Sequence, residues 1–427
     1  MTARMTIFAL SSGMPPAAIA VIRISGIQAA AAIGALAGKL PQPRRASMRT
    51  LRDPATDMEL DQALVLWFPG PGSATGEDLA ELHLHGGRAV VQAVLSALAQ
   101  CEGLREALPG EFTRRAFENG RIDLSEAEGL ADLLFAETEA QRRSAIAMAE
   151  GHFSRRVAAW QKELLRISAL VEAELDFSDE DDVPQGAVEK VAAMLASLQD
   201  QLAAELARPS AERLRDGIRV VLAGPPNAGK STLLNALAGR DAAIVSPIAG
   251  TTRDRIEAPV ALAGVPFLLM DTAGLRGEGS DEIEHIGIGL TRRAMEDADI
   301  ILWLGGAQDC PEDERVVPLA AKCDLGGKGE GLKISARTGE GMDQLRTELV
   351  TRARSLVPRD GEYALNKRQR DALAIVADEL REGVSSTDYL VLAEHLRGAR
   401  AALDQVTGRA GTEEMLDALF GSFCIGK

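Results

Sequence analysis

The sequence predicts a multidomain protein of the α/β and α classes, in which an α/β domain is inserted into a helical domain. Three observations support this prediction. Residues 1–118 mix short apolar runs with a helical pattern, a long proline-free helical pattern follows from Ser125, and a glycine-rich motif at 224–232 separates two helical stretches. With 427 residues, the chain is also too long for one ordinary core. We place the boundaries at 1–118, 119–214, 215–354 and 355–427, where the second and fourth segments form one helical domain.

Composition limits the classes of protein to consider. The hydrophobic fraction of 46% and the charged fraction of 26% are typical of a globular protein, and no cationic leader or long apolar run is present. We therefore expect a cytoplasmic protein that does not span a membrane. The formal net charge of −16 argues against a protein that holds nucleic acid mainly by neutralising phosphates. The four cysteines lack metal-ligand spacing and are expected to be free thiols.

The first domain is expected to be α+β. The runs "IAVIRIS" (19–25) and "QALVLWF" (62–68) have the β-branched and apolar character of strands, and "RAVVQAVLSALAQ" (88–100) has helical spacing.

The region after the first domain has a helical pattern, and its helices are expected to serve as a structural scaffold. Val157, Trp160, Leu164, Ile167 and Val171 recur at intervals of three and four, which predicts a seam between packed antiparallel helices. After an acidic break at 176–186, the helical pattern resumes at 188–207, and again from Asn366 to the end of the chain.

The strongest motif lies at the start of the inserted domain. "IRVVLA" (218–223) reads as a buried strand, "GPPNAGKST" (224–232) matches G-x-x-x-x-G-K-[ST], and a helical pattern follows at once. Backbone amides of such a loop hold phosphates, Lys230 reaches the β and γ oxygens, and the Ser231 hydroxyl ligates Mg²⁺.

Companion motifs favour GTP over ATP. "GTTRD" (250–254) supplies Thr252 as a second Mg²⁺ ligand, and "LLMDTAG" (268–274) places Asp271 at the end of a strand, with the Gly274 amide facing the γ-phosphate. "AKCD" (321–324) offers Asp324 to the donors of guanine, and "ISAR" (334–337) closes over the base. The set predicts a Ras-like GTPase domain.

Two details bear on hydrolysis. Leu275 follows the DxxG motif where many GTPases carry a water-orienting Gln, so Glu284 is a candidate for that role; the alternative is an ordinary solvated carboxylate. Asn227 lies in the phosphate loop, where its amide oxygen and oxygens of 246–251 form a candidate site for a monovalent cation in place of an arginine finger.

Further motifs extend over nearly the whole chain: "VIRISG", "TGEDLAELHLHGG" (75–87), "PGEFTRRAFENGRIDLSEAEGLADL" (109–133) and the closing "FCIGK". With these motifs and the GTPase motifs, the chain resembles the bacterial tRNA modification GTPases of the MnmE (TrmE) family. The resemblance implies a homodimer that assembles with the FAD-binding partner MnmG as a heterotetramer. Together they would add an aminomethyl-type group to carbon 5 of the wobble uridine of certain tRNAs.

The resemblance also implies roles for particular residues. A tetrahydrofolate derivative, 5,10-methylene- or 5-formyl-tetrahydrofolate, would bind Arg23, Glu81, Arg121 and Lys427 in the N-terminal domain. K⁺ would bind Asn227, Ser246, Ile248 and Thr251, and Glu284 would be catalytic. GTP would contact Asn227, Ala228, Gly229, Lys230, Ser231, Thr232, Ser246, Thr251, Thr252, Asp271, Thr272, Ala273, Gly274, Lys322, Asp324, Ser335, Ala336 and Arg337.

The chain ends on "SFCIGK" (422–427), which is apolar until its last residue. The resemblance implies that this tail brings Cys424 and Lys427 to the folate pocket, with burial of "FCI" holding it in place. A thiolate there would act as a nucleophile or redox group. The alternative is that Cys424 anchors the tail as a small apolar side chain.

Some positions depart from the family pattern. Ala321 replaces the usual Asn of NKxD, which removes a side chain that ties the base loop to the phosphate loop, so weaker GTP affinity is expected. The stretch between Leu304 and Lys322 is too short for the usual helix, Ala74 replaces an aromatic residue, and Arg121 stands where Lys is common.

Two rival functions remain open at this stage. A regulatory GTPase, for example in ribosome assembly, would carry a basic RNA-binding appendage and would have no use for "FCIGK". A structural scaffold with a decayed nucleotide site, at which Ala321 hints, would not retain Lys230, Ser231, Thr252, Asp271 and Asp324 together.

Overall fold

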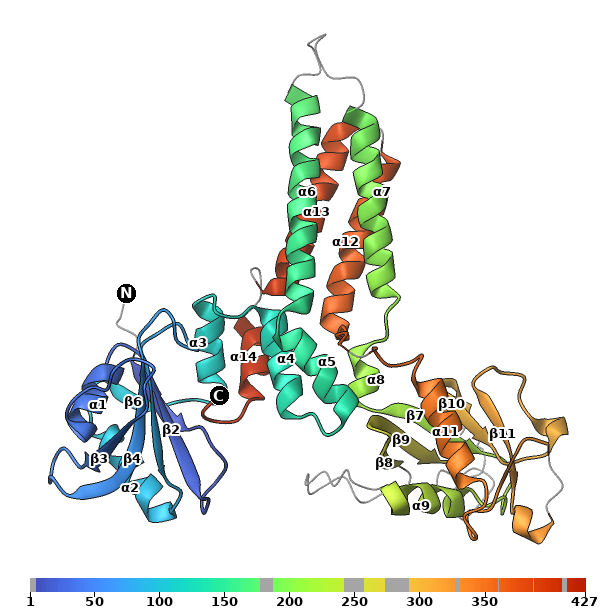
Figure 1. Ribbon diagram of the computed structural model, residues 1–427. Helices are drawn as coiled ribbons and strands as arrows, with labels where there is room; N and C mark the ends of the chain where they lie inside the picture. Colours follow the sequence, from blue (N-terminus) through green and yellow to red (C-terminus); the bar gives the residue numbers. More distant parts are fainter. Residues whose placement is uncertain are drawn as a thin grey trace. The chain divides into compact units, whose positions relative to one another are not determined.

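The computed structural model describes residues 5–176, 187–241, 257–272, 292–326, 330–359, 361–386, 388–408 and 413–427 (Figure 1). The chain divides into two compact units. One combines Met1–Ala131 with Thr407–Lys427, and the other is Asp132–Val406. Each has its own core of buried apolar side chains. None of the helices in the described ranges is long and apolar enough to span a membrane.

The first unit is built on a six-stranded sheet in the order β3-β4-β5-β2-β1-β6. The strands are β1 (Thr6–Leu10), β2 (Ile19–Ser25), β3 (Ser47–Arg52), β4 (Glu59–Phe68), β5 (Leu79–His85) and β6 (Leu104–Glu106). Only the β1–β6 pair is parallel among them. Helices α1 (Ala29–Ala37) and α2 (Arg88–Ala99) pack on one face of this sheet through the buried cluster that contains Ile22 and Ile24. The predicted α+β domain is therefore confirmed.

Helices from both ends of the chain complete this unit. Helices α3 (Glu111–Glu118) and α4 (Leu124–Leu134) follow the sheet, and α14 (Glu413–Gly421) packs against α3. The expectation that helix continues to the chain end is wrong for the last six residues. Ser422–Lys427 form turns and irregular backbone, and Gly426 has a φ of 95°, which lies outside the helical region.

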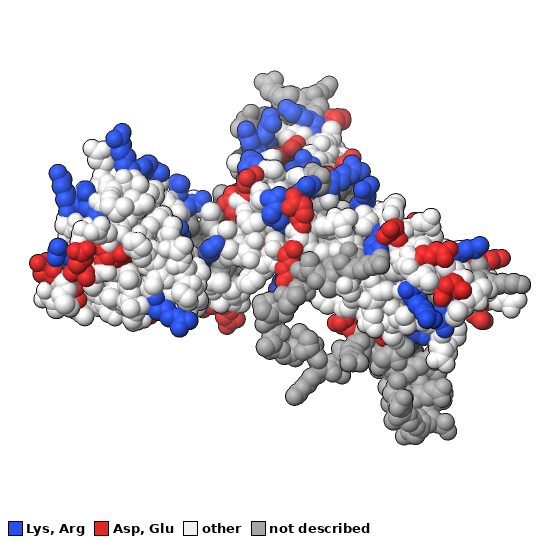
Figure 2. Space-filling model, turned by 60° about the horizontal axis from the view of Figure 1, so that its bottom comes forward, with Lys and Arg blue, Asp and Glu red and all other residues white. Residues whose placement is uncertain are grey.

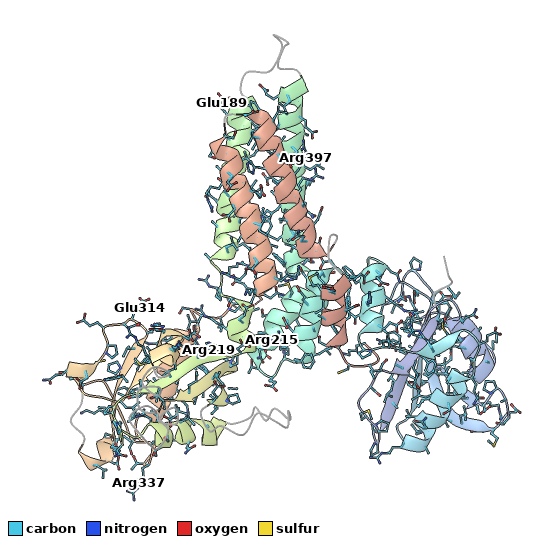
Figure 3. The ribbon with its side chains drawn as sticks, turned by 180° about the vertical axis from the view of Figure 1, so that it is seen from behind. Glu189, Arg215, Arg219, Glu314, Arg337 and Arg397 are labelled. Carbon is cyan, nitrogen blue, oxygen red and sulfur yellow. The ribbon has the colours of Figure 1, made fainter. Side chains whose placement is uncertain are left out.

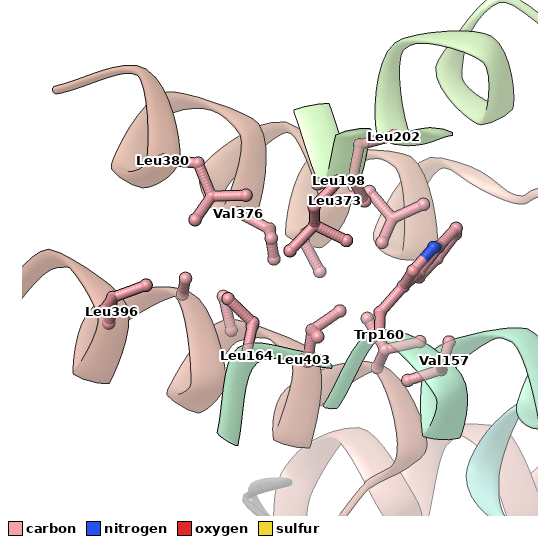
Figure 4. Close-up of a cluster of buried hydrophobic side chains, with 14 of the residues drawn as sticks. Val157, Trp160, Leu164, Leu198, Leu202, Leu373, Val376, Leu380, Leu396 and Leu403 are labelled. Atoms are coloured by element: carbon pink, nitrogen blue, oxygen red, sulfur yellow. The ribbon is translucent and has the colours of Figure 1, made fainter. Parts of the chain in front are cut away.

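The second unit contains the helical bundle. It comprises α6 (His152–Asp176), α7 (Ala187–Leu206), α12 (Lys367–Ser385) and α13 (Tyr389–Thr407), with the shorter α5 (Glu139–Ala149) beside α6. Every predicted seam residue from Val157 to Val171 is at most 1% exposed. Trp160 fills the space between helices near Leu198, Leu202 and Leu373 (Figure 4). The predicted packing of helices from both sides of the insertion is confirmed.

The inserted domain is an α/β layer structure with the sheet order β12-β11-β10-β7-β9-β8. Its strands are β7 (Ile218–Ala223), β8 (Glu257–Leu262), β9 (Val265–Asp271), β10 (Ile300–Trp303), β11 (Val316–Ala321) and β12 (Leu332–Ile334), and only β8 runs antiparallel to its neighbour. Helices α8 (Ala211–Arg215), α9 (Lys230–Asp241) and α11 (Met342–Ala353) join the same domain. Between β10 and β11, the one helical element is the 3₁₀ turn η1 (Ala307–Asp309), as the short spacing predicts.

Candidate functional site

The glycine-rich loop lies between β7 and α9. The central strand β7 ends at Ala223, and α9 begins at Lys230. Gly224 has a φ of 140°, and a Cβ at this position would lie 3.0 Å from the carbonyl carbon of Leu304. Any side chain here would force the loop away from the neighbouring chain after β10. The loop backbone is therefore held close to the carboxyl edge of the sheet, with the first amides of α9 available to an anion.

Lys230 crosses the inside of the loop. Its side chain is buried, and Nζ donates hydrogen bonds of 2.9 Å to the carbonyl oxygens of both Gly224 and Pro225. Phosphate oxygens are charged and are stronger acceptors for an ammonium than neutral carbonyls. The geometry therefore suits an exchange in which Lys230 turns from these carbonyls to the phosphates of a nucleotide.

Ser231 and Asp271 meet at the same edge. The Ser231 hydroxyl donates a hydrogen bond to the Asp271 carboxylate, which lies at the end of β9 and is buried. Next to it, the Thr272 hydroxyl donates to the Leu222 carbonyl oxygen at 2.8 Å and fixes the exit of the strand. Hydroxyl and carboxylate oxygens are the hard donors that Mg²⁺ prefers, so this pair fits the expected metal.

A pocket of about 170 Å³ adjoins the loop. Eight of the residues predicted to contact GTP line it: Ala228, Gly229, Thr232, Lys322, Asp324, Ser335, Ala336 and Arg337. Its apolar walls were not predicted, and they come from Leu233, Leu304, Ala321, Leu325 and Ile334. Apolar walls with one carboxylate among the lining groups suit a flat base that presents N–H donors, as guanine does.

The loop after β12 is shaped by its own hydrogen bonds. Ser335 is 1% exposed; its hydroxyl accepts from the Thr338 amide at 3.1 Å, and its amide donates to the Glu340 carbonyl at 2.9 Å. Ser335 therefore shapes the turn that carries Ala336 and Arg337 to the pocket. Arg337 is exposed at the outer end of this domain (Figure 3).

Lys322 joins the base pocket to the phosphate loop. Its Nζ donates a hydrogen bond of 2.7 Å to the carbonyl oxygen of Asn227, while its own backbone has a φ of 59°. The sequence predicts that Ala321 removes one side chain that would tie these two loops together. The neighbouring Lys322 supplies a different connection. A lysine is long enough to reach across, but sequence alone does not indicate which acceptor it finds.

Several predicted residues lie outside the described ranges. They are Ser246, Ile248, Thr251, Thr252, Ala273, Gly274 and Glu284. The predicted K⁺ ligands are thus represented among the described residues by Asn227, and the Mg²⁺ ligands by Ser231.

A second group of predicted residues lies in the first unit. Arg23 on β2 and Glu81 on β5 are direct cross-strand partners, and Arg23 Nη2 donates to Glu81 Oε1 at 2.8 Å. His83 Nε2 lies 3.3 Å from the other Glu81 oxygen, and the Arg23 guanidinium stands 5.9 Å from the Phe112 ring centre. The sheet thus presents an acid, a guanidinium and an imidazole together, and the histidine was not predicted.

The other two predicted folate residues are placed by different contacts. Arg121 follows α3, and its side chain packs over Gly76, where a Cβ would lie 3.2 Å from the Arg121 Cγ. Lys427 follows Gly426, whose carbonyl accepts a 2.8 Å hydrogen bond from the Ser11 hydroxyl just beyond β1. The chain end therefore lies beside the strand that pairs with β2.

Cys424 is exposed within this tail. The predicted burial of "FCI" is wrong for two of its three residues, because Phe423 is buried whereas Cys424 and Ile425 are exposed. The Cys424 carbonyl accepts from the Gly110 amide at 3.5 Å, so backbone contacts hold the tail while the thiol remains accessible.

The fold and the loop geometry define the class of this protein. A parallel sheet with a G-x-x-x-x-G-K-S loop at its carboxyl edge, a Ser–Asp pair and an adjoining base pocket are the parts of a P-loop GTPase domain. Here that domain interrupts a helical bundle and accompanies an α+β unit.

Comparison with known proteins identifies the family. Residues 6–121 match the model described as GTP-binding protein TrmE N-terminus, and residues 124–424 match the MnmE helical domain. The chain is 57% identical over 424 residues to the tRNA modification GTPase MnmE of Erythrobacter litoralis, covering 99% of this chain and 100% of that protein. It is 51% identical over 436 residues to the protein of the same name from Zymomonas mobilis, with the same coverages. The chain belongs to the MnmE family of tRNA modification GTPases.

Among solved structures, the chain is similar to the G domain of the T. maritima FeoB iron transporter. The two are 25% identical, and the match covers 32% of this chain and 98% of that chain, with a TM-score of 0.24.

Proposed function

We propose that this chain hydrolyses GTP with activation by K⁺ and that hydrolysis serves tRNA modification. In this proposal, the chain acts as a homodimer with the FAD-dependent protein MnmG. The complex adds a carboxymethylaminomethyl-type group to carbon 5 of uridine 34 and takes a one-carbon unit from tetrahydrofolate. The observation that carries the proposal is the convergence of Lys230, the Ser231–Asp271 pair and the base pocket at one edge of a sheet.

The chain's own residues supply binding and orientation. Lys230 moves from the loop carbonyls to the β and γ phosphates, and Asp324 accepts the N–H donors of guanine. Ser231, which donates a hydrogen bond to Asp271, and Thr252 would hold Mg²⁺, and the ion would supply positive charge to stabilise the phosphates. Glu284 orients the attacking water, since Leu275 has no polar group for that task.

The rate of GTP hydrolysis by Glu284→Ala tests whether Glu284 orients the attacking water. The variant should bind GTP as the unaltered chain does and lose most of its turnover, because general-base assistance contributes about 10²- to 10⁴-fold. Unchanged turnover would remove Glu284 from the mechanism.

K⁺ is proposed to bind Asn227, Ser246, Ile248 and Thr251 and to act where other GTPases use an arginine finger. The bond from Lys322 to the Asn227 carbonyl supports this role, because it fixes the loop that carries the Asn227 amide. Hydrolysis rates in KCl and in NaCl at equal ionic strength test it. We expect a large K⁺-specific stimulation that Asn227→Ala weakens more than it weakens GTP affinity. Equal rates in both salts would contradict the K⁺ site.

The folate is proposed to bind Arg23, Glu81, Arg121 and Lys427, with Cys424 as a nucleophile or redox group. The paired guanidinium and carboxylate of Arg23 and Glu81 support this site, because a folate carries both carboxylates and pterin donors. Binding of 5-formyl-tetrahydrofolate to the unaltered chain and to Arg23→Gln, measured by calorimetry, would reveal whether the pair is needed.

We also propose that MnmG provides much of the tRNA contact and that the complex is cytoplasmic. The net charge of −16 favours recognition by a complex over capture by a broad cationic surface. On the face drawn in Figure 2, both acidic and basic side chains are present. Nucleoside mass spectrometry of tRNA from a deletion strain tests the modification. Loss of the modified wobble uridine separates this proposal from a regulatory GTPase and from a scaffold, since either would leave it intact.

A further inference from the structure

Helix α14 is attached to α3 by an apolar contact and by an ionic one. On the apolar side, the ring centres of Phe117 and Phe420 lie 6.0 Å apart, and those of Phe420 and Phe423 lie 6.2 Å apart. Gly110 admits this approach, since a Cβ there would lie 2.1 Å from the Phe420 carbonyl oxygen. These contacts bury the last aromatic residues of the chain.

On the ionic side, one guanidinium contacts three carboxylates. Arg114 Nη2 lies 2.5 Å from Glu413 Oε2, Nη1 lies 2.5 Å from Asp417 Oδ1, and Nε lies 3.0 Å from Glu118 Oε1. Glu413 and Asp417 are four residues apart and therefore stand one above the other on α14. Both reach Arg114 only when that face of α14 is turned towards α3.

The tail beyond α14 depends on this orientation. Six residues separate Gly421 from the chain end, and their backbone meets the first unit at Gly110, at Ser11 and at Leu10. A rotation of α14 would move the origin of this short segment and break contacts that fit closely. A shift of about 1 Å in a reacting group can cost about 10²-fold in rate.

We propose that Arg114 is a positioning residue for the C-terminal tail. Its two ion pairs, with Glu413 and Asp417, set the rotation of α14 about its axis. That rotation in turn determines where Cys424 and Lys427 lie. This inference rests on the proposed role of the tail in tRNA modification. Arg114 itself touches neither nucleotide nor folate in this proposal. The apolar contacts attach the helix, and the ion pairs of Arg114 add to them on the face of α14 that carries Glu413 and Asp417.

The test compares Arg114→Gln, Arg114→Lys and the unaltered full chain. We expect Arg114→Gln to speed amide hydrogen exchange over residues 413–427 and to lower the turnover of uridine modification about tenfold, with GTP hydrolysis unchanged. Arg114→Lys keeps the positive charge but has a single ammonium in place of the two terminal guanidinium nitrogens. Its exchange rate and modification turnover should therefore lie between those of Arg114→Gln and the unaltered chain. Arg397→Gln is the matched control, because within the described residues Arg397 (Figure 3) forms its ion pair with Glu394 of the same helix.

Unchanged exchange over 413–427 in Arg114→Gln would overturn the inference, as would faster exchange with full modification turnover. A failure of the proposed function would give a different result. The unaltered chain itself would then not support uridine modification, while hydrogen exchange over residues 413–427 would still show whether Arg114 holds α14 in place.

Discussion

At the scale of single residues, Lys322 joins the two loops that a nucleotide contacts. We predict that Lys322→Met lowers GTP affinity about tenfold, because it removes a charge-assisted hydrogen bond worth about 1.5–3 kcal/mol and leaves the apolar stem. Titration with a fluorescent guanine nucleotide measures the dissociation constant. Lys333→Met is the control, since Lys333 is exposed on the adjacent strand β12. Equal affinities in the two variants would show that the bond to Asn227 contributes nothing to binding.

The carboxyl group of Glu111 is expected to make the folding stability of the first unit depend on pH in the acid range. Burial raises the pKa of its carboxyl, but hydrogen bonds from Arg105, the Leu108 amide and Arg115 outweigh burial and hold the pKa below its ordinary value of 4.5. Its contribution to folding is therefore complete above pH 4.5 and is lost as pH falls through the lowered folded value. Glu111→Gln should be less stable than the unaltered chain at neutral pH and should lose less stability on acidification.

Denaturant unfolding at neutral pH and below pH 4.5, followed by a signal from the first unit, measures this difference. Glu102→Gln serves as the control because Glu102 is exposed. The same acid-induced loss in Glu111→Gln and in the unaltered chain would assign the pH dependence to other groups.

At the scale of elements, the local sequence predicts the strands and helix ends that are determined by neighbouring residues. The strands at 19–25 and 218–223 have the predicted bounds, and α12 begins after Asn366, whose side chain forms a capping box with Gln369. The helical region predicted from Ser125 consists of three helices, and the breaks between them were not predicted from the sequence. Thr138 caps α5, and Gly151 has a φ of 74° before α6. Neither break contains a proline, and the local signals are the capping box of Thr138 with Gln141 and the left-handed Gly151.

The tail shows an element that local sequence does not specify. Gly426 has a φ of 95°, and a Cβ there would lie 2.2 Å from the Leu10 carbonyl oxygen. We predict that Gly426→Ala displaces the chain end, costs about 1–3 kcal/mol of local strain and lowers uridine modification, while GTP hydrolysis persists. Nucleoside mass spectrometry and a hydrolysis assay measure the two effects.

Gly421→Ala provides the comparison for that experiment. Gly421 ends α14 in the same segment, and a Cβ there would meet nothing within 4 Å. If both alanine variants modify tRNA equally well, the close approach of Gly426 to β1 has no role in the activity.

At the scale of the whole molecule, the sequence predicts the parts of the GTP site better than their connections. Lys230, Ser231 and Asp271 belong to motifs whose spacing fixes their place at a sheet edge, and the structure brings them together. The bond between Lys322 and Asn227 spans 95 residues of chain, and that between Ser11 and Gly426 spans 415. Such contacts depend on how complete elements pack, which the pattern of a single segment does not encode.

The division into two units predicts that the two chemistries can be separated by mutation. Cys424 belongs to the unit that ends with Thr407–Lys427, whereas the nucleotide loop belongs to Asp132–Val406. We predict that Cys424→Ser keeps GTP hydrolysis within about twofold and abolishes uridine modification, since a hydroxyl is a far weaker nucleophile than a thiolate. Lys230→Ala should lose both, because modification depends on hydrolysis in the proposed function. Cys101→Ser, which alters a half-buried thiol of the same unit, should lose neither. Full modification by Cys424→Ser would assign Cys424 to anchoring the tail and would leave the GTPase assignment untouched.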